Sequence, residues 1–521
     1  MVDSQGKLDS AGINHLIIQA GGKGTRMKGL TRNKPKCLIS INGQPLLYNQ
    51  INAFYNVEDV FIIADYKKDV LKRYVDAYNP TNKKITVVDT SGEGTIAGIA
   101  DAAKRIKGSG GIAIVWSDLY FLKPLRITEH SSNLLFLSRE NKCRWSYSNG
   151  ELTEKNSRTA GVIGIFIFND KSLLTKLPGS GEFVRYLKEK YQELDLATVY
   201  ADNIKEIGTY LKFIRFVKNF KTARFFNNIE FRKKFIIKKV VDKAFQDVYQ
   251  KEINWYMEIQ KYKIRYIPKV LATNPLTLEK INGVHPWEIE TEKARGTTLT
   301  NIIKSLNNLH SLDRVPFDRV ALNAELIEKT KKRISRVFAL IPENGTRYYV
   351  INNKKVKNLF YSNNLKDIDT LVNKISSLKY FNIIHGDPTF SNTLVETKSS
   401  NIKFIDPRGY FGKHLIFGDP RYDFAKLYYS AAGDYDQFNS GKFSTEIYSN
   451  SVYVKIKSNR YKKLAKKAFS KTDFNLEEIQ IMHALIWLAL SGYFMNDLDA
   501  VLGSYFHGLE LFYEIYPSVI R

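Results

Sequence analysis

Three side chains in the C-terminal part of the chain have the types and spacing that phosphoryl transfer to a hydroxyl requires. Asp387 and Asn392 lie in residues 385–392, which read HGDPTFSN, and Asp406 follows a short apolar run at residues 402–405. One carboxylate orients the attacking hydroxyl and takes its proton, while an amide oxygen and a second carboxylate hold Mg²⁺ on the nucleotide phosphates. We therefore predict that Asp387 is the catalytic base and that Asn392 and Asp406 are metal ligands.

A second set of candidate residues follows an apolar run near the N-terminus. Residues 16–18 have the composition of a buried strand, and residues 19–27 read QAGGKGTRM. Glycines between a strand and a helix let the backbone turn sharply and bring N–H groups against phosphate oxygens. Arg26 adds a fixed positive fork for a triphosphate. The residues predicted to contact nucleotide here are Ala20, Gly21, Gly22, Gly24 and Thr25.

The N-terminal motifs resemble those of the sugar-1-phosphate nucleotidyltransferase superfamily, which includes phosphocholine cytidylyltransferases. Its signature, G-G-x-G-T-R-(L/M) followed by P-K-x-L, matches residues 21–27 and 35–38. The competing dinucleotide fingerprint G-x-G-x-x-G is excluded because Met27 stands where the third glycine is required. The resemblance implies that Lys36 faces an acceptor phosphate and that Gly94 and Thr95 lie beside the nucleotide base, although residues 94–103 also fit a simple helix start.

Two carboxylates of this half are predicted to hold Mg²⁺. Asp118 follows the apolar run at residues 112–116, and ligands in open α/β sheets bind outside the carboxyl ends of strands. The superfamily places its first metal-binding Asp there. Its second carboxylate comes from a segment matched by residues 205–209, which implies Glu206 in place of the commoner Asp. Asp202 is the alternative.

The C-terminal motifs resemble the aminoglycoside phosphotransferase and choline kinase family, whose loop reads H-G-D-x-x-x-x-N with a later I-D. The resemblance implies a two-lobed kinase-like domain in which Lys238 grips nucleotide phosphates, Glu252 pairs with it, and Glu279 belongs to a hinge that meets adenine. Lys239 points to the opposite face of the same strand. The expected glycine-rich loop is missing, and residues 227–230, NNIE, stand in its place. Either the turn uses asparagines or this lobe holds nucleotide differently.

The same family implies roles for other residues of this half. His310, in a helical pattern at residues 299–312, is expected to be structural, and Asp423 to cap a helix and brace the 385–392 loop. Arg408 is placed for a substrate or phosphate contact. Residues 485–516 are predicted to be a buried helical segment.

Short apolar runs alternate with amphipathic segments through the first half of the chain, which is typical of a doubly wound α/β sheet. Periodicity is lost near residue 220. We therefore predict a nucleotidyltransferase domain at residues 1–218 and a kinase-like α+β domain at 219–521, with a small lobe to about residue 285 and a large lobe from 286. The runs predicted as strands of the first domain are residues 16–18, 60–64, 85–88, 112–116, 134–138 and 162–168.

Composition limits the classes of partner. The 521 residues include 79 Lys and Arg against 53 Asp and Glu, a net charge of +26, which favours polyanionic partners such as nucleotides. No segment shows a basic aromatic groove, so nucleic acid is not an expected partner. Two cysteines cannot form a disulfide framework and indicate a cytoplasmic protein. No apolar stretch approaches the length of a membrane span, and the first residues lack the pattern of a signal peptide. A homo-oligomer is possible.

These motifs together predict a bifunctional enzyme. One half phosphorylates a sugar or small alcohol with ATP, and the other transfers a nucleotidyl group from a second NTP, with CTP or UTP favoured, to the new phosphate. Both reactions use Mg²⁺. The NDP-activated product would serve capsule or lipopolysaccharide biosynthesis. The alternatives are a choline or ethanolamine kinase joined to a cytidylyltransferase, and a non-catalytic regulatory protein built from decayed enzymes.

Overall fold

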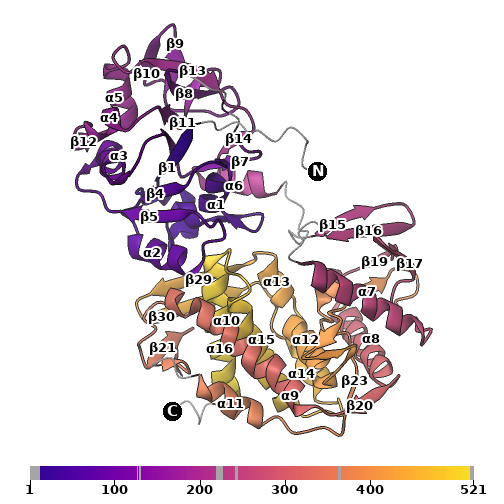
Figure 1. Cartoon of the computed structure of the whole chain (residues 1–521). Helices are drawn as coiled ribbons and strands as arrows, with labels where there is room; N and C mark the ends of the chain where they lie inside the picture. The colour runs from indigo at the N-terminus through magenta and orange to yellow at the C-terminus, as the bar shows by residue number, and fades with distance from the viewer. Residues whose placement is uncertain are drawn as a thin grey trace. The chain divides into compact units, whose positions relative to one another are not determined.

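A computed structural model describes residues 12–125, 127, 131–218, 227–240, 245–361 and 365–516. The chain divides into two compact units, which are coloured by residue number in Figure 1 and are described separately. The first unit comprises Met1–Lys221 and Asn496–Leu498, and the second comprises Thr222–Met495 and Asp499–Arg521. The domain boundary predicted near residue 220 lies outside the described residues.

The first unit is built on a mixed β-sheet. Its strands are β1 (Ile13–Gln19), β2 (Ser40–Ile41), β3 (Gln44–Pro45), β4 (Asp59–Ile63), β5 (Lys84–Val88), β6 (Gly111–Trp116), β7 (Leu119–Phe121), β8 (Asn133–Ser138), β9 (Ser146–Ser148), β10 (Glu151–Thr153), β11 (Gly161–Phe168), β12 (Ser180–Gly181), β13 (Leu196–Tyr200) and β14 (Ile204–Glu206). The main sheet has the order β10-β9-β11-β6-β1-β4-β5, and β8 pairs with both β11 and β13. The six runs predicted as strands all form strands of this sheet.

The direction of β11 makes the sheet mixed. Strands β5, β4, β1 and β6 run parallel, whereas β11 lies antiparallel between β6 and β8. Leu16, Ile17 and Ile18 of β1 are all fully buried. A strand covered on both faces has no need of polar alternation, which explains its continuous apolar run.

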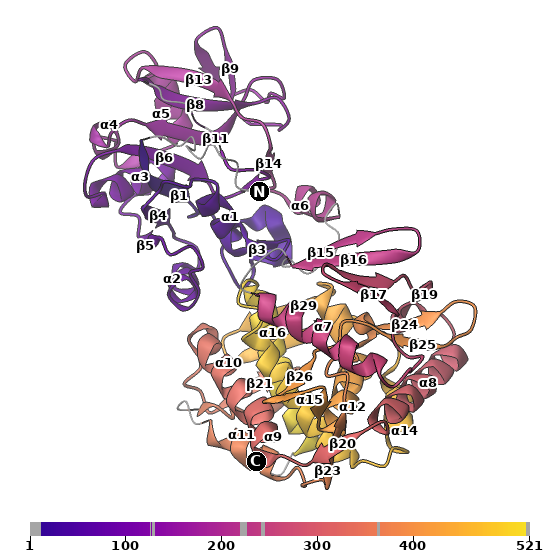
Figure 2. The same ribbon diagram turned by 45° about the vertical axis from the view of Figure 1, so that its right-hand side comes forward.

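Helices cover this sheet. They are α1 (Leu46–Asn52), α2 (Lys68–Ala77), α3 (Gly94–Arg105), α4 (Ser172–Thr175), α5 (Phe183–Glu189) and α6 (Tyr210–Val217). Figure 2 shows α3, α4 and α5 grouped together, and their apolar side chains share one core with β1, β4, β6 and β11. A second cluster joins Met27, Leu46 and Phe213, which ties the segment after β1 to α1 and α6.

The second unit combines a small antiparallel sheet with a larger, mainly helical part. The small sheet has the order β15-β16-β18-β17, formed by β15 (Asn227–Phe231), β16 (Phe235–Val240), β17 (Val270–Thr273) and β18 (Leu276–Glu279). Helix α7 (Gln246–Gln260) packs its buried face, including Ile253, Tyr256 and Ile259, in one cluster with Leu276 and Leu278 of β18.

The larger part is formed by helices and several short sheets. Its helices are α8 (Glu292–His310), α9 (Arg319–Asn323), α10 (Lys329–Val337), α11 (Lys366–Asn373), α12 (Pro420–Ala431), α13 (Tyr435–Asn439), α14 (Lys462–Phe469), α15 (Leu476–Ser491) and α16 (Leu498–Ile515), with a π-helical turn, η5 (Ala324–Glu328), before α10. Its strands are β19 (Gly283–Val284), β20 (Arg314–Pro316), β21 (Tyr348–Ile351), β22 (Lys354–Lys357), β23 (Tyr380–Ile383), β24 (Thr393–Glu396), β25 (Ile402–Phe404), β26 (Tyr410–Phe411), β27 (His414–Leu415), β28 (Phe417–Gly418), β29 (Phe443–Tyr448) and β30 (Ser451–Ile456).

Two helix predictions differ from the structure. Helix α8 begins at Glu292, because the side chain of Thr291 accepts a hydrogen bond from the N–H of Ala294 and caps the helix there. The segment 485–516 is not one helix: α15 ends at Ser491, with Gly492 as its C-cap residue, and α16 begins at Leu498. In the described part of the chain, no helix joins sufficient length to sufficient apolarity to cross a membrane.

Candidate active sites

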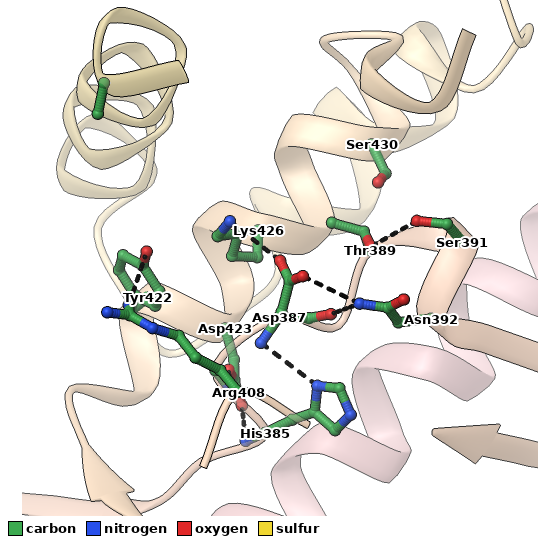
Figure 3. A network of polar contacts seen from close by, with 12 residues as sticks. His385, Asp387, Thr389, Ser391, Asn392, Arg408, Tyr422, Asp423, Lys426 and Ser430 are labelled. Carbon is green, nitrogen blue, oxygen red and sulfur yellow. Dashed lines mark hydrogen bonds and ion pairs between the residues drawn. The ribbon is translucent and has the colours of Figure 1, made fainter. Parts of the chain in front are cut away.

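The loop at residues 385–392 brings a carboxylate, an amide and an ammonium group together in the second unit (Figure 3). Asn392 Nδ2 donates to both the carbonyl oxygen and Oδ2 of Asp387, at 2.9 Å each. Lys426 Nζ, on α12, lies 3.0 Å from Asp387 Oδ1. Because Nδ2 of Asn392 is engaged, its Oδ1 is the atom that remains for a cation. Sequence reasoning paired Asp387 with Asn392 and missed Lys426.

Asp423 of α12 is hydrogen-bonded to the first two residues of this loop. Its carboxylate accepts hydrogen bonds from the backbone N–H groups of His385 and Gly386, at 2.8 and 2.7 Å, and lies 3.0 Å from Nε2 of His310. The predicted bracing role of Asp423 and the structural role of His310 agree with these contacts. The predicted capping role is wrong: Asp419 caps α12, accepting from the N–H of Arg421, and Asp423 lies inside the helix.

His385, the first residue of the loop, is fully buried. Its Nδ1 accepts a hydrogen bond from the N–H of Asp387 at 3.3 Å, and its ring packs edge-on against Trp255 of α7. Burial lowers the pKa of His385 although Asp423, Asp387 and Asp406 oppose the shift. Gly386 has φ +81°, and a Cβ there would lie 2.8 Å from Cβ of Arg408, so only glycine fits.

Lys238 is the centre of a second polar cluster. Its Nζ lies 2.7 Å from Glu252 Oε2 on α7 and 2.9 Å from Asp406 Oδ1 after β25. Burial opposes the charge of Lys238, but the two carboxylates hold its pKa above the usual value. Lys239, the next residue of β16, is exposed and pairs with Glu230 instead. The two lysines therefore lie on opposite faces of β16, as the alternation of side chains along a strand predicted, and only Lys238 contacts Glu252 and Asp406.

Two further predictions concerned the small sheet: a turn at residues 227–230 and a hinge that contains Glu279. Asn227–Phe231 form strand β15, so asparagines do not make the turn; the turn is Arg232–Lys233–Lys234, closed by a bond from the N–H of Arg232 to the carbonyl of Phe235. The hinge was predicted for residues 276–283. Residues 276–279 form β18, which is paired on both sides, and residues 280–282 follow it outside any strand, so the hinge role stays a prediction for that part. Glu279 accepts a bond from the N–H of Lys269, and its contact with adenine stays a prediction.

In the first unit, the glycine-rich segment follows β1 as predicted. Gly24 has φ +64°, and a Cβ there would approach Thr31 Cγ2 to 2.9 Å, so the position requires glycine. The hydroxyl of Thr31 donates to the carbonyl of Gly24 at 3.1 Å. Ala20 is buried, whereas Gly22, Thr25 and Arg26 are exposed. The backbone of this segment and the Arg26 side chain are thus accessible to a ligand.

Asp118 and Glu206 converge at one end of the sheet. Asp118 follows β6, and its carbonyl accepts from the N–H of Ile207, just after β14. A Cβ on Gly208 would lie 2.3 Å from Glu206 Oε1 and 2.7 Å from Asp118 Oδ2, so both carboxylates border the same small space. Lys36 Nζ lies 2.9 Å from Asp118 Oδ2.

The donor set at this end fits Mg²⁺. That ion is usually held by one or two carboxylates, with substrate phosphates and water completing its shell. No cluster of three or more His, Cys, Asp or Glu suited to a metal occurs among the described residues. Asp202, the alternative second ligand, is exposed in the turn before β14. Lys212 of α6, which sequence reasoning missed, pairs with Glu206.

Gly94 and Thr95 have a structural explanation in the first unit. A Cβ on Gly94 would come 2.2 Å from the carbonyl oxygen of Gly181, so its backbone packs directly on β12. The Thr95 hydroxyl accepts a bond from the N–H of Phe183, at the start of α5. Their predicted contact with a nucleotide base stays a prediction.

Comparison with known proteins assigns part of the first unit to a family. Residues 16–140 match the family model of the MobA-like NTP transferase domain. The N-terminal region is a MobA-like NTP transferase domain. This transferase domain contains the glycine-rich segment, Lys36 and Asp118, whereas Glu206 lies beyond the matched residues.

Curated relatives match part of the chain. The D-glycero-alpha-D-manno-heptose 1-phosphate guanylyltransferase of Campylobacter jejuni is 26% identical over 225 residues, 39% of this chain and 98% of the relative. A probable glucose-1-phosphate cytidylyltransferase of Bacillus subtilis is 34% identical over 79 residues, 15% of this chain. The adenosylcobinamide-phosphate guanylyltransferase of Methanocaldococcus jannaschii is 34% identical over 111 residues, 20% of this chain. The chain spans 31% and 53% of the length of the last two.

Solved structures also match part of the chain. HddC from Yersinia pseudotuberculosis is 21% identical, with a TM-score of 0.34, covering 40% of this chain and 100% of that one. The CTP:phosphocholine cytidylyltransferase LicC from Streptococcus pneumoniae is 18% identical, with a TM-score of 0.32, covering 40% and 99%.

Proposed function

We propose that the second unit is a small-molecule kinase and that the transferase domain consumes its product. The observation that carries the kinase is the meeting of Lys238, Glu252 and Asp406 in one ion cluster. A lysine that is fixed by a helix carboxylate and reaches the metal-binding Asp is the arrangement that protein kinases use to hold nucleotide phosphates. The 385–392 loop supplies the remaining two groups, Asp387 and Asn392.

In the kinase step, Asp387 orients the acceptor hydroxyl and accepts its proton as the oxygen attacks the γ-phosphorus of ATP. Lys238 binds the α- and β-phosphates, and ADP leaves. Asn392 Oδ1 and the Asp406 carboxylate would hold Mg²⁺, which neutralises charge on the phosphates. The bonds from Asn392 Nδ2 to Asp387 keep both side chains in this orientation.

In the nucleotidyl transfer step, an oxygen of the acceptor phosphate attacks the α-phosphorus of an NTP, and pyrophosphate leaves. Arg26 and the N–H groups of residues 20–25 bind the triphosphate, and Lys36 binds the attacking phosphate. Asp118 and Glu206 would hold Mg²⁺, which supplies charge stabilisation for the leaving pyrophosphate. The product is an NDP-activated acceptor.

We propose that the product serves surface glycan synthesis. Relatives named as transferases of heptose 1-phosphate and glucose 1-phosphate support a sugar phosphate as the substrate. A sugar is therefore the proposed acceptor class. Relatives named as CTP:phosphoglutamine and 2-aminoethylphosphonate cytidylyltransferases favour a small non-sugar acceptor as the second candidate.

The test is a pair of assays on the full chain. ADP release is measured with ATP, Mg²⁺ and a panel of sugars and alcohols, and pyrophosphate release with four NTPs and the matching phosphates. We expect one acceptor to stimulate ADP release and its phosphate to stimulate pyrophosphate release. Pyrophosphate release without any acceptor-dependent ADP release would be consistent with the proposed transferase activity and would contradict the proposed kinase activity.

A further inference from the structure

Cationic side chains crowd one side of the candidate base. Figure 3 shows Asn392 on one side of Asp387, and Lys426, Tyr422 and Arg408 on the other. Lys426 Nζ, 3.0 Å from Asp387 Oδ1, also lies 5.9 Å from the ring centre of Tyr422. The Lys426 side chain keeps 17% of its surface exposed and that of Asp387 keeps 22%, so a small solute can reach both.

Two basic side chains, Arg408 and Lys329, contact the buried carboxylate of Glu325, in the π-helical turn η5. Arg408 Nη2 lies 2.6 Å from Glu325 Oε2, and Lys329 pairs with Oε1. The hydroxyl of Tyr422 donates to Oε1 of Glu325 at 3.1 Å and lies 3.2 Å from Arg408 Nη1, which links this pair to the Lys426 side. One turn of π-helix is often found at functional sites.

Basic side chains gather at Glu325 and Asp387. Lys329 and Arg408 both pair with Glu325, and Lys426 pairs with Asp387, so three basic groups share two carboxylates. Burial, and then the charge of Arg408, holds the pKa of Lys329 well below its usual range; Glu325 opposes this, while Arg333 and Lys426 add to it. An incoming anion would relieve this crowding.

The aromatic rings beside the base already face these cations. The Tyr422 ring centre lies 5.7 Å from the Arg408 guanidinium and 6.0 Å from Lys329 Nζ. The Tyr429 ring centre lies 5.5 Å from Lys426 Nζ. Binding of a quaternary ammonium would require ring faces that are free to receive it. A choline-like acceptor therefore does not suit this side of Asp387.

Resting on the kinase function proposed above, we propose that the phosphoryl acceptor is an anionic alcohol. Its carboxylate or phosphate is bound by Lys329, Arg408 and Lys426, which places its hydroxyl at Asp387. Charge-assisted bonds to Arg408 and Lys426, with Lys329 as a further donor, select the anion and reject an ammonium of the same shape.

The test compares two sets of small acceptors whose members differ in charge. One set is glucose, glucuronate, glucose 6-phosphate and glucosamine; the other is glycerol, glycerate, glycerol 3-phosphate and choline. ADP release by the full chain is measured against the concentration of each compound. We expect an anionic member to have a kcat/KM at least ~10-fold above the neutral and cationic members. The glucuronate and glycerate arms distinguish a carboxylate from a phosphate.

A charge-removing variant separates binding of the anion from a general catalytic defect. Lys329→Gln with Lys426→Gln should lower the anion-to-neutral ratio of kcat/KM at least ~10-fold, whatever happens to kcat. Lys463→Gln with Lys467→Gln removes two charges from the exposed side of α14 and should leave the ratio unchanged.

The inference is overturned if glucosamine, choline or a neutral compound is the best acceptor, or if the double variant keeps the ratio. It is also overturned if the chain binds an ATP analogue with Mg²⁺ but uses no anionic member of either set. Failure to bind the ATP analogue at all would contradict the kinase itself and is thereby distinguished from these results.

Discussion

Asp387 is held by Asn392 on one side and Lys426 on the other, so its carboxylate has a fixed direction and a defined role. Asp387→Asn preserves the size of the side chain and removes the proton acceptor. We expect ATP-dependent phosphorylation to fall by at least ~10²-fold, the usual contribution of a general base. Pyrophosphate release from a supplied acceptor phosphate should be unchanged, because the transferase domain contains its own groups. Loss of both activities in a folded variant would contradict two separate sites.

The transferase site offers the converse test. Asp118→Ala should slow nucleotidyl transfer by at least ~10²-fold, because one metal ligand and the partner of Lys36 are lost. Asp202→Ala is the matched control: it is exposed in the turn before β14, and we expect near-normal transfer. Kinase activity should survive in both variants. If nucleotidyl transfer depended on Asp202 and not on Asp118, the assignment of Asp118 as the metal ligand would be wrong.

At the scale of elements, β16 presents adjacent lysines to opposite faces. Lys238→Met removes the partner of Glu252 and Asp406, and we expect kcat/KM for ATP to fall at least ~10-fold, a loss of ~1.4 kcal/mol in transition-state stabilisation. Lys239→Met removes only an exposed pair with Glu230 and should leave the kinetics unchanged. Circular dichroism confirms folding of each. Equal effects at both positions would contradict the assignment of Lys238.

The start of α13 gives a prediction for pH. Burial raises the pKa of Asp434 from its ordinary value of 3.8 to about 6, and the N–H of Asn459 donates to its Oδ1. Since the folded pKa is raised, the stability contribution is full below pH 3.8 and is lost as pH rises through 6. Asp434→Asn keeps the acceptor and the left-handed backbone, φ +57°. It should stabilise the protein by about 1–2 kcal/mol at pH 7.5 and have little effect at pH 4. Urea unfolding at both values measures this, and an equal effect at both would contradict it.

Local sequence patterns predicted the strands and helices that carry the motifs. They predicted the contacts between those elements less well. Apolar runs marked the strands of the first sheet because a strand buried on both faces has no polar positions, as Leu16, Ile17 and Ile18 show. Helix ends were missed where a cap decides them, as Thr291 does for α8. The turn after β15 was missed because its three basic residues carry no turn signal.

At the scale of the whole molecule, motifs predicted candidate residues for both sites, but not the groups that surround them. Arg408 was expected to contact substrate or phosphate, but its pairing with Glu325, far away in the sequence, is visible only in the folded chain. Lys212 and Lys426 were missed for the same reason. The acceptor class therefore depends on tertiary contacts that no single segment encodes.

The most direct test of two consecutive reactions in one chain uses two labels. The full chain is incubated with γ-labelled ATP, an NTP labelled at its α-phosphate, Mg²⁺ and the acceptor found active above. Both labels should enter one product, the ATP label at the phosphate next to the acceptor, and the released pyrophosphate should carry neither. Asp387→Asn should give no labelled product from the free acceptor, and a supplied acceptor phosphate should restore a product that carries only the NTP label. An NDP-linked product that never contains phosphate from ATP would contradict the account.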